Sequence, residues 1–182
     1  MDLKSYFKPL SDEIYQNQNN WQTTQIGHQI QSNNSITFPE YKYCEIALFN
    51  IREYQGSDNL FTDKECKIRK EIYSLHFDTP PRICDLGFLD LSDSRKESFK
   101  KIEEVCAELL KNGILPIVIG GGHDITYALY KSYSSLEKSI TLTTVDKKFD
   151  LGIKDEKLSN TNFFSKILEA KPNNLFHYCN IG

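Results

Sequence analysis

The sequence has 182 residues, of which 39% are hydrophobic and 12% aromatic, enough apolar material for one domain with a substantial core. The formal net charge of −3, without a run of lysines or arginines, argues against binding to nucleic acid or to an anionic membrane surface. The five cysteines are widely spaced and include no Cys-x-x-Cys pair, which predicts reduced thiols. The first residues do not resemble a signal peptide, and no apolar run is long enough to span a membrane, so the protein is expected to be cytoplasmic.

The first forty residues are predicted to form an irregular N-terminal arm. Residues 1–40 include a stretch dense in Gln and Asn, where turn residues interrupt the few apolar side chains. Regular structure is expected to begin with a strand over residues 44–51, a short and mostly apolar run with the composition of a buried strand. No internal repeat or linker divides the rest, so residues 41–182 are expected to form one folded domain.

Helices and strands are predicted to alternate along the rest of the chain. A helix is expected from Thr62 or Asp63 to about Leu75, and a strand over residues 82–86 follows, closed by Gly87. The remaining helices are predicted over residues 94–112, 125–132 and 162–170, and the remaining strands over residues 115–120, 139–145 and 175–181. This alternation predicts βαβ units, and hence an α/β fold with a mostly parallel sheet.

A glycine-rich turn marks the first candidate for chemistry. The apolar run over residues 115–119 ends in three glycines, and His123 and Asp124 follow at the start of a helix. Glycine permits backbone conformations that are closed to other residues and lets a ligand approach closely. His123 is therefore expected at the carboxyl end of a buried strand, where open parallel α/β sheets bind ligands. The dipole of the helix by itself accounts for Asp124 as a first-turn carboxylate.

Two aspartates and a lysine follow the strand predicted over residues 139–145. In an extended segment Asp146, Lys148 and Asp150 point to the same side. If this strand lies beside the strand that ends at Gly120, His123 points into the same crevice. One histidine with two carboxylates is typical of a metal site, and a pair of divalent ions held there would generate a hydroxide nucleophile at neutral pH.

Lys148 does not fit the metal site as a ligand. A lysine ammonium has three donors and no lone pair for a metal, so at neutral pH it does not replace an imidazole. A cation between Asp146 and Asp150 would instead relieve their mutual repulsion, which favours Lys148 as a built-in counter-ion. The alternative is that the lysine side chains point into solvent and that neither aspartate is buried.

The order of strand, Gly-Gly-Gly-His, helix, strand and Asp-x-x-x-Asp resembles the family of arginases, agmatinases and formimidoylglutamases, from about Cys44 onwards. The resemblance implies a three-layer α/β/α fold, assembly into a homo-oligomer, and metal-dependent hydrolysis of C–N bonds in small linear amidines. It also implies that His123, Asp146 and Asp150 bind a manganese pair, with Lys148 at the position of a further histidine ligand. The Gly-Gly-Gly-His motif favours the formimidoylglutamase branch.

Other departures from the family pattern predict an inactive or metal-poor protein. The His-Gly pair that the family has after its Asp motif is missing from residues 159–162, and the later Asp-x-Asp strand does not occur before Gly182. The sequence therefore resembles the first half of a family member, and its sheet is expected to be incomplete or to leave an edge that must be covered. A non-catalytic member that serves structure or binds a partner is the alternative function.

A nucleotide-binding module is a further alternative, because glycine-rich turns between a strand and a helix also bind phosphates. Against it, the turn at residues 119–122 is not followed by Gly-Lys-Ser/Thr, and Ile125 occupies the last glycine position of Gly-x-Gly-x-x-Gly. The other histidines have simpler explanations. We expect His28 and His76 at the surface, and His177, inside an apolar strand, as a hydrogen-bonded core residue.

Overall fold

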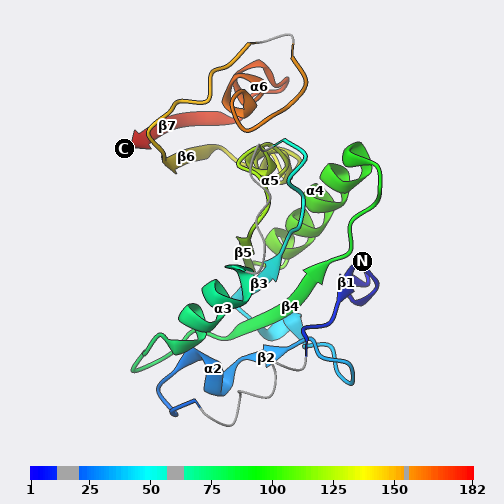
Figure 1. Cartoon of the computed structure of the whole chain (residues 1–182), viewed down its shortest axis with the longest axis vertical. Coiled ribbons are helices and arrows are strands. Elements are labelled where there is room, and N and C mark those ends of the chain that lie inside the picture. The colour runs from blue at the N-terminus through cyan, green and yellow to red at the C-terminus, as the bar shows by residue number, and fades with distance from the viewer. Residues whose placement is uncertain (12–20, 57–63, 154–155) are drawn as a thin grey trace. The chain divides into compact units, whose positions relative to one another are not determined.

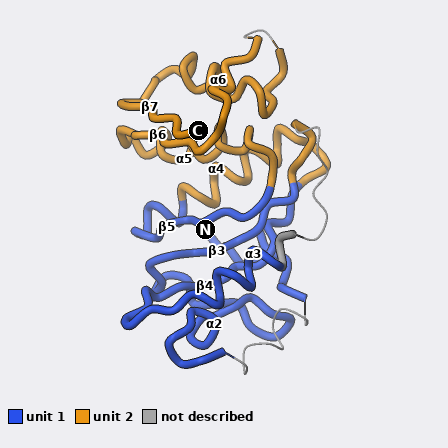
Figure 2. The backbone as a smooth tube through the Cα atoms, turned by 60° about the vertical axis from the view of Figure 1, so that its left-hand side comes forward, with its two compact units in different colours: residues 1–52, 61–91, 108–120 blue, residues 53–60, 92–107, 121–182 orange. Residues whose placement is uncertain are grey.

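The computed structural model describes residues 1–11, 21–56, 64–153 and 156–182. The chain forms two compact units (Figure 2), which are described separately. Unit 1 consists of residues 1–52, 61–91 and 108–120, and unit 2 of residues 53–60, 92–107 and 121–182. No helix among the described residues combines the length and the apolar character needed to cross a membrane.

Unit 1 is built on a five-stranded sheet (Figure 1). Strand β3 (Ile46–Asn50) lies between β4 (Ile83–Leu89) and β5 (Leu115–Ile119), and both neighbours run parallel to it. Two short strands pair with β4: β1 (Phe7–Lys8) is antiparallel and β2 (Gln31–Ser32) is parallel. The predicted strands over residues 44–51, 82–86 and 115–120 are thus confirmed, with ends that differ by a few residues.

The central strand is buried because both of its edges and both of its faces are covered. Ala47, Leu48 and Phe49 are at most 1% exposed, in the continuous apolar run that is typical of a parallel strand within a sheet. Leu48 and Ile119 pack with Tyr73 in a cluster of buried side chains. The hydrophobic effect on these residues is therefore the main force that holds the strands of unit 1 in place.

Short helices complete unit 1. They are η1 (Leu3–Tyr6), α2 (Ile26–Gln29), η3 (Tyr41–Tyr43) and α3 (Lys64–Ser74). Ile26 and Ile30 bring the N-terminal part of the chain into the same core cluster. Helix α3 confirms the helix expected up to Leu75, whereas the residues expected at its start, Thr62 and Asp63, lie outside the described residues.

A buried ion pair links α3 to β4. Arg69 and Asp85 have fully buried side chains, and the Arg69 Nε and Nη2 atoms donate to the two Asp85 oxygens at 2.5 and 3.1 Å. The Tyr73 hydroxyl donates to the same carboxylate at 2.7 Å, and the Gly87 N–H donates to it at 2.9 Å. With four donors on one carboxylate, the buried negative charge is well compensated.

The sequence predicted that this strand ends at Gly87. That prediction is wrong, because β4 continues to Leu89. Gly87 has a φ of +87°, and a Cβ atom at this position would collide with the carbonyl oxygen of Lys8 in β1. Glycine is required here because it allows the left-handed conformation and the close approach of the two backbones. A glycine inside a strand pattern therefore marked a close contact rather than a strand end.

Helix α4 (Arg95–Lys111) confirms the helix predicted over residues 94–112. Its apolar residues recur at helical spacing, and three of them, Ile102, Val105 and Leu109, are completely buried. Lysine and glutamate residues occupy the other side of the helix. Residues 95–107 of α4 belong to unit 2 and its last turn belongs to unit 1.

Unit 2 combines part of α4 with a second, smaller sheet. Helix α5 (Ile125–Ser134) precedes β6 (Ile140–Val145), and α6 (Phe163–Glu169) precedes β7 (Leu175–Ile181). Strands β6 and β7 form a parallel ladder, in which Thr143 lies opposite Cys179. The core of this unit is an aromatic cluster of the buried residues Tyr130, Phe163, Phe164 and Ile167.

The predicted α/β class with a mostly parallel sheet is confirmed, since the ladder between β1 and β4 is the one antiparallel pairing among the named strands of the described residues. The condition that the strand before Asp146 pairs beside the strand ending at Gly120 is not met among the described residues, because β5 pairs with β3 and β6 pairs with β7. The apolar pattern of each strand predicts that the strand is buried beside a neighbouring strand. The pattern does not specify which strand is its hydrogen-bonding partner.

Candidate metal centre

His123 is positioned by the turn that follows β5. Gly120 and Gly121 have φ values of +82° and +78°, and these left-handed conformations explain two of the three glycines. The third glycine is needed for space, because a Cβ atom on Gly122 would lie 2.5 Å from Oδ1 of Asp124 and 2.6 Å from Oδ1 of Asn160. The turn therefore delivers His123 to the start of α5, two residues before Ile125.

The two aspartates come from the segment after β6. Asp146 is the first residue beyond this strand, and its N–H donates to the carbonyl of Ile181 at the end of β7. Asp150 follows four residues later and has a φ of +51°. A left-handed conformation is uncommon for aspartate, although Asp and Asn tolerate it better than most residues. The segment thus turns back after β6 and presents both carboxylates.

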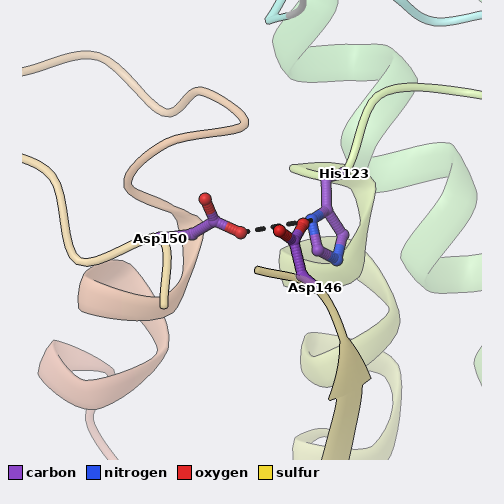
Figure 3. A group of neighbouring side chains, drawn as sticks. All are labelled: His123, Asp146 and Asp150. Carbon is purple, nitrogen blue, oxygen red and sulfur yellow. Dashed lines mark ion pairs between the residues drawn. The ribbon is translucent and has the colours of Figure 1, made fainter. Parts of the chain in front are cut away.

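The three predicted ligands meet at one point (Figure 3). The Nδ1 atom of His123 lies 3.2 Å from Oδ2 of Asp146 and 3.2 Å from Oδ2 of Asp150. One ligand atom from each residue lies within 4.8 Å of the other two. Figure 3 shows the imidazole of His123 directed towards both carboxylates. The arrangement is a compact group of one nitrogen and two oxygen donors that come from two separate segments of unit 2.

Burial distinguishes the two aspartates. The Asp150 side chain is 7% exposed, whereas those of Asp146 and His123 are 29% and 33% exposed. Burial raises the pKa of the Asp150 carboxyl above its ordinary value, and the Asp146 carboxylate adds to the rise. His123 and Lys148 oppose this rise, since positive charge favours the ionised form. In the absence of a bound cation, the charge on Asp150 is therefore costly to the folded state.

Lys148 lies next to this group without an ion-pair contact to it. Its side chain is exposed, and no carboxylate of a described residue lies within 4.0 Å of its ammonium group. Its backbone N–H donates to Oδ1 of Asp146 at 2.9 Å, and its carbonyl accepts from Asn180 at 3.1 Å. The place between the two carboxylates is occupied by the imidazole of His123, while Lys148 acts on Asp150 at longer range.

A charged network behind the glycine turn was not predicted from the sequence. The buried carboxylate of Asp124 accepts a close hydrogen bond from Nη2 of Arg95, and Arg95 Nε lies 3.4 Å from Glu53. The carbonyl of Glu53 accepts from Gly122 at 2.8 Å, and Asn160 accepts from the N–H of Asp124 at 3.2 Å. These contacts hold the backbone on both sides of His123.

Residues far apart in the sequence form this network, which explains why it was missed. The sequence analysis did not single out Arg95 or Glu53, and it explained Asp124 by the helix dipole alone. The imidazole also packs against the buried ring of Phe163, with 4.5 Å between ring centroids. Backbone contacts and ring packing together restrict the orientation of His123, and ligands held in this way need less reordering when a metal binds.

Among the described side chains, the remaining histidines and cysteines do not join the site. Nδ1 of His76 and the hydroxyl of Thr24, both in unit 1, form a hydrogen bond of 2.8 Å. His177 is exposed on β7, so the prediction of a core histidine was wrong. Tyr178 packs against the aromatic cluster of unit 2, and the alternation of β7 places the preceding residue, His177, on the opposite face. Among the described cysteines, Cys44, Cys84, Cys106 and Cys179 are free.

The sequence pattern of the arginase family matches residues 55–182, more than half of the chain. The chain belongs to the arginase family. Formimidoylglutamase from Legionella pneumophila is 36% identical over 104 residues, which are 55% of this chain and 31% of that protein. An uncharacterized 32.2 kDa protein from Methanothermus fervidus is 33% identical over 109 residues, covering 56% of this chain and 37% of that protein.

Solved structures of this family share the fold. Formimidoylglutamase from Bacillus subtilis superposes with a TM-score of 0.67 at 16% identity, over 87% of this chain and 52% of that one. Formiminoglutamase from Trypanosoma cruzi, solved with Mn²⁺, gives a TM-score of 0.65 at 16% identity, over 80% and 57% of the two chains. The chain thus spans about a third of the curated relatives and about half of the solved ones.

The residues at the centre fit a divalent metal ion. Carboxylates suit Mn²⁺ and Mg²⁺, and an imidazole nitrogen adds a ligand that first-row transition metals accept. Ligand atoms that lie within 4.8 Å of one another can surround one ion after small side-chain movements. A cation there would also offset the cost of the charge on the buried Asp150. The donor set therefore favours one ion held by three protein ligands.

Proposed function

We propose that this protein is a divalent-metal-dependent hydrolase of the formimidoylglutamase type, which cleaves a C–N bond of a small linear amidine, in place of the inactive or metal-poor protein that the departures from the family pattern predict. The observation that carries the proposal is the meeting of the His123 imidazole with the carboxylates of Asp146 and Asp150 within 4.8 Å. The names of several relatives support the formimidoylglutamase branch. Cytoplasmic location, manganese as the metal and assembly into a homo-oligomer belong to the same proposal.

Each of the three residues has a defined task in this proposal. Nδ1 of His123 and the Oδ2 atoms of Asp146 and Asp150 bind the ion. When bound, a divalent ion supplies Lewis acidity, which makes water a nucleophile at neutral pH. The network of Arg95 and Asp124 keeps the backbone of His123 in place, so that the imidazole does not swing away from the carboxylates.

The substrate class of small amidines rests on the names of the relatives. Asp146 and Asp150 are assigned to the ion, which balances their two negative charges, so these carboxylates do not by themselves select a cationic substrate.

Lys148 leads us to propose one ion rather than two. The lysine occupies the motif position where the family resemblance implies a further histidine ligand, and its ammonium has no lone pair to offer. Its exposed position keeps it from competing with His123 for the two carboxylates. We assign it the role of a nearby counter-charge, which lowers the cost of ionising Asp150.

Hydrolysis is tested with the purified chain and Mn²⁺ by following product formation from N-formimidoylglutamate with proton NMR, with agmatine and arginine as comparison substrates. The proposal expects formamide release that requires His123 and Mn²⁺ and is faster than either comparison reaction. The Asp93→Asn variant, which changes an exposed aspartate outside the centre, is the matched control. Release that is equally fast from the His123→Ala variant would contradict the assignment.

A non-catalytic role in structure or partner binding is the second candidate. It is favoured by Lys148 at a ligand position and by the share of the relatives that this chain spans. This alternative expects Mn²⁺ binding without any turnover of the three substrates, or no binding at all. Turnover that depends on His123 would exclude it.

A further inference from the structure

A cavity of about 470 Å³ lies within unit 2, between α4, α5 and the segment at Lys157 and Leu158. Its volume is within the range of sites that bind small molecules. None of the three residues of the candidate metal centre lines it, and neither does the glycine turn. The cavity is therefore a second place in this unit where a ligand can be accommodated.

One wall of the cavity is apolar and aromatic. The rings of Phe99 and Tyr127 are half-buried, and Ala128 and Leu158 add aliphatic surface. Arg95 stabilises this wall, because its guanidinium lies 4.9 Å from the centre of the Phe99 ring and donates to the carbonyl of Leu158 at 2.6 Å. A flat ring that stacked on this wall would cover apolar surface now open to water.

Positive charge surrounds this wall. Five of the lining residues are lysine or arginine and one is glutamate, in a chain whose net charge is −3. Arg95 is paired with Glu53 and Asp124, and Lys100 lies 3.7 Å from Glu104. The other cationic lining residues have no ion pair with a carboxylate in the described part of the chain; they are Lys96, Lys131 and Lys157.

The three lysines without an ion pair in the described part of the chain come from three different segments. Lys96 lies in α4, Lys131 in α5, and Lys157 in the segment that precedes α6. The backbone of Lys157 is held in place, since the buried amide of Asn162 donates to the carbonyl of Lys157 at 3.0 Å. Because the charges converge from separate segments on one cavity, a ligand with more than one negative charge can contact several of them.

Glu103 and Tyr127 supply hydrogen-bonding groups beside the apolar wall. Burial raises the pKa of the Tyr127 hydroxyl, and the Glu103 carboxylate raises it further, so the hydroxyl remains a donor at neutral pH. The Glu103 carboxylate accepts hydrogen bonds and would repel a phosphate. An amino group on a heteroaromatic ring is a partner that a single carboxylate among cations can bind.

We propose that this cavity binds a nucleoside diphosphate with an amino-substituted base, its ring on the wall of Phe99 and Tyr127 and its phosphates among Lys96, Lys131 and Lys157. An inorganic anion would leave the apolar wall uncovered, and a neutral ring would leave the ammonium groups without a partner. Stacking on aromatic side chains and contacts from lysine to phosphate are the usual means of holding such ligands.

Isothermal titration calorimetry of the full chain in EDTA, with ADP, adenosine and pyrophosphate as separate probes, tests the proposal. EDTA keeps metal out of the candidate centre, so the result does not depend on the proposed hydrolysis. ADP is expected to bind at least about tenfold more tightly than either of the other two probes. Absence of saturable ADP binding up to about 5 mM, or pyrophosphate binding as tight as that of ADP, would overturn the proposal.

Variants locate the binding. Charge reversal by Lys131→Glu in α5, or by Lys157→Glu outside any helix, is expected to weaken ADP binding by at least about tenfold. Tyr127→Ala is expected to weaken it by about tenfold through lost stacking. Lys138→Glu changes an exposed lysine that does not line the cavity and serves as the control. Equal affinities for Lys157→Glu and Lys138→Glu would refute the site, even if the other variants fail to fold.

Discussion

The Nδ1 atom of His123 lies 3.2 Å from Oδ2 of the buried Asp150, whose backbone adopts a φ of +51°. The two residues belong to the turn before α5 and to the loop after β6, respectively. An aspartate in a left-handed conformation costs free energy that the rest of the fold must offset. Here that conformation carries the carboxylate to the imidazole, and backbone strain of this kind is common at functional sites.

The buried charge of Asp150 predicts opposite effects of one substitution on stability and on metal binding. The pKa of Asp150 is raised in the folded protein, so its contribution to stability is present below the ordinary aspartate pKa and is lost as the pH rises through the folded value. Asp150→Asn should therefore raise the melting temperature of the EDTA-treated protein at neutral pH, and the rise in melting temperature should be smaller at acidic pH. The same substitution should weaken Mn²⁺ binding by about 100-fold or more, because it removes a ligand.

Differential scanning calorimetry and Mn²⁺ titration of the same samples check this prediction. The control is Asp93→Asn, which removes an exposed carboxylate outside the centre. A lower melting temperature of the metal-free Asp150→Asn protein at neutral pH would show that the carboxylate stabilises the fold, contrary to the expectation.

The space around Gly122 predicts a local steric effect. A methyl group from Gly122→Ala would press against Asp124 and Asn160, and such overpacking is expected to cost about 1–3 kcal/mol in free energy of unfolding. Because His123 is the next residue, Mn²⁺ affinity should fall as well. Gly113→Ala is the control, since its Cβ would have no atom within 4 Å and the cost would arise from a φ of +74° alone.

Urea unfolding gives the stability of both glycine variants, and Mn²⁺ titration gives their affinity. The account predicts that Gly113→Ala loses stability without any change in Mn²⁺ affinity. If Gly122→Ala binds Mn²⁺ as well as the unchanged protein does, the tight turn is not what positions His123.

The buried ion pair of unit 1 predicts a large loss of stability on removal of one partner. Asp85→Asn leaves the guanidinium of Arg69 buried without a counter-charge, which is expected to cost about 3–5 kcal/mol. Tyr73→Phe removes one hydrogen bond to the same carboxylate and is expected to cost about 1 kcal/mol. Urea unfolding of both variants measures the difference, and equal losses would mean that the charge of Asp85 is not what matters.

Tyr73 also predicts how the protein responds to alkali. Burial, and next the nearby Asp85 carboxylate, raise the pKa of Tyr73 well above its ordinary value. Its contribution to stability is therefore present below the ordinary tyrosine pKa of about 10 and is lost as the pH rises through the folded value. Stability measured by urea unfolding should decline more steeply above about pH 10 in the unchanged protein than in Tyr73→Phe. Identical slopes would contradict the prediction.

Local patterns in the sequence were sufficient for the elements and for the choice of ligands. Apolar runs and helical spacing located β3, α4 and β7, because burial of a strand or of a helix face leaves a periodic trace in the sequence. His123, Asp146 and Asp150 stood out because each follows the carboxyl end of a predicted strand, and the structure brings all three together.

Long-range relationships were beyond the sequence. The pairing of β6 with β7 rather than with β5 depends on hydrogen bonds between distant segments. The burial of Asp124 and Glu53 against Arg95 likewise depends on contacts between residues of three segments, none of which shows a pattern of its own. His177 was misassigned for a related reason, since an apolar strand does not indicate which of its two faces is covered.

Binding of Mn²⁺ to the metal-free protein tests the central claim most directly. The account predicts saturable binding of one ion per chain, measured by calorimetry, and a loss of affinity of at least about tenfold in His123→Ala. His177→Ala, which removes an exposed histidine on β7, should bind as the unchanged protein does. Absence of saturable binding, or equal affinity of the His123→Ala and His177→Ala variants, would contradict the assignment of His123, Asp146 and Asp150 as a metal centre.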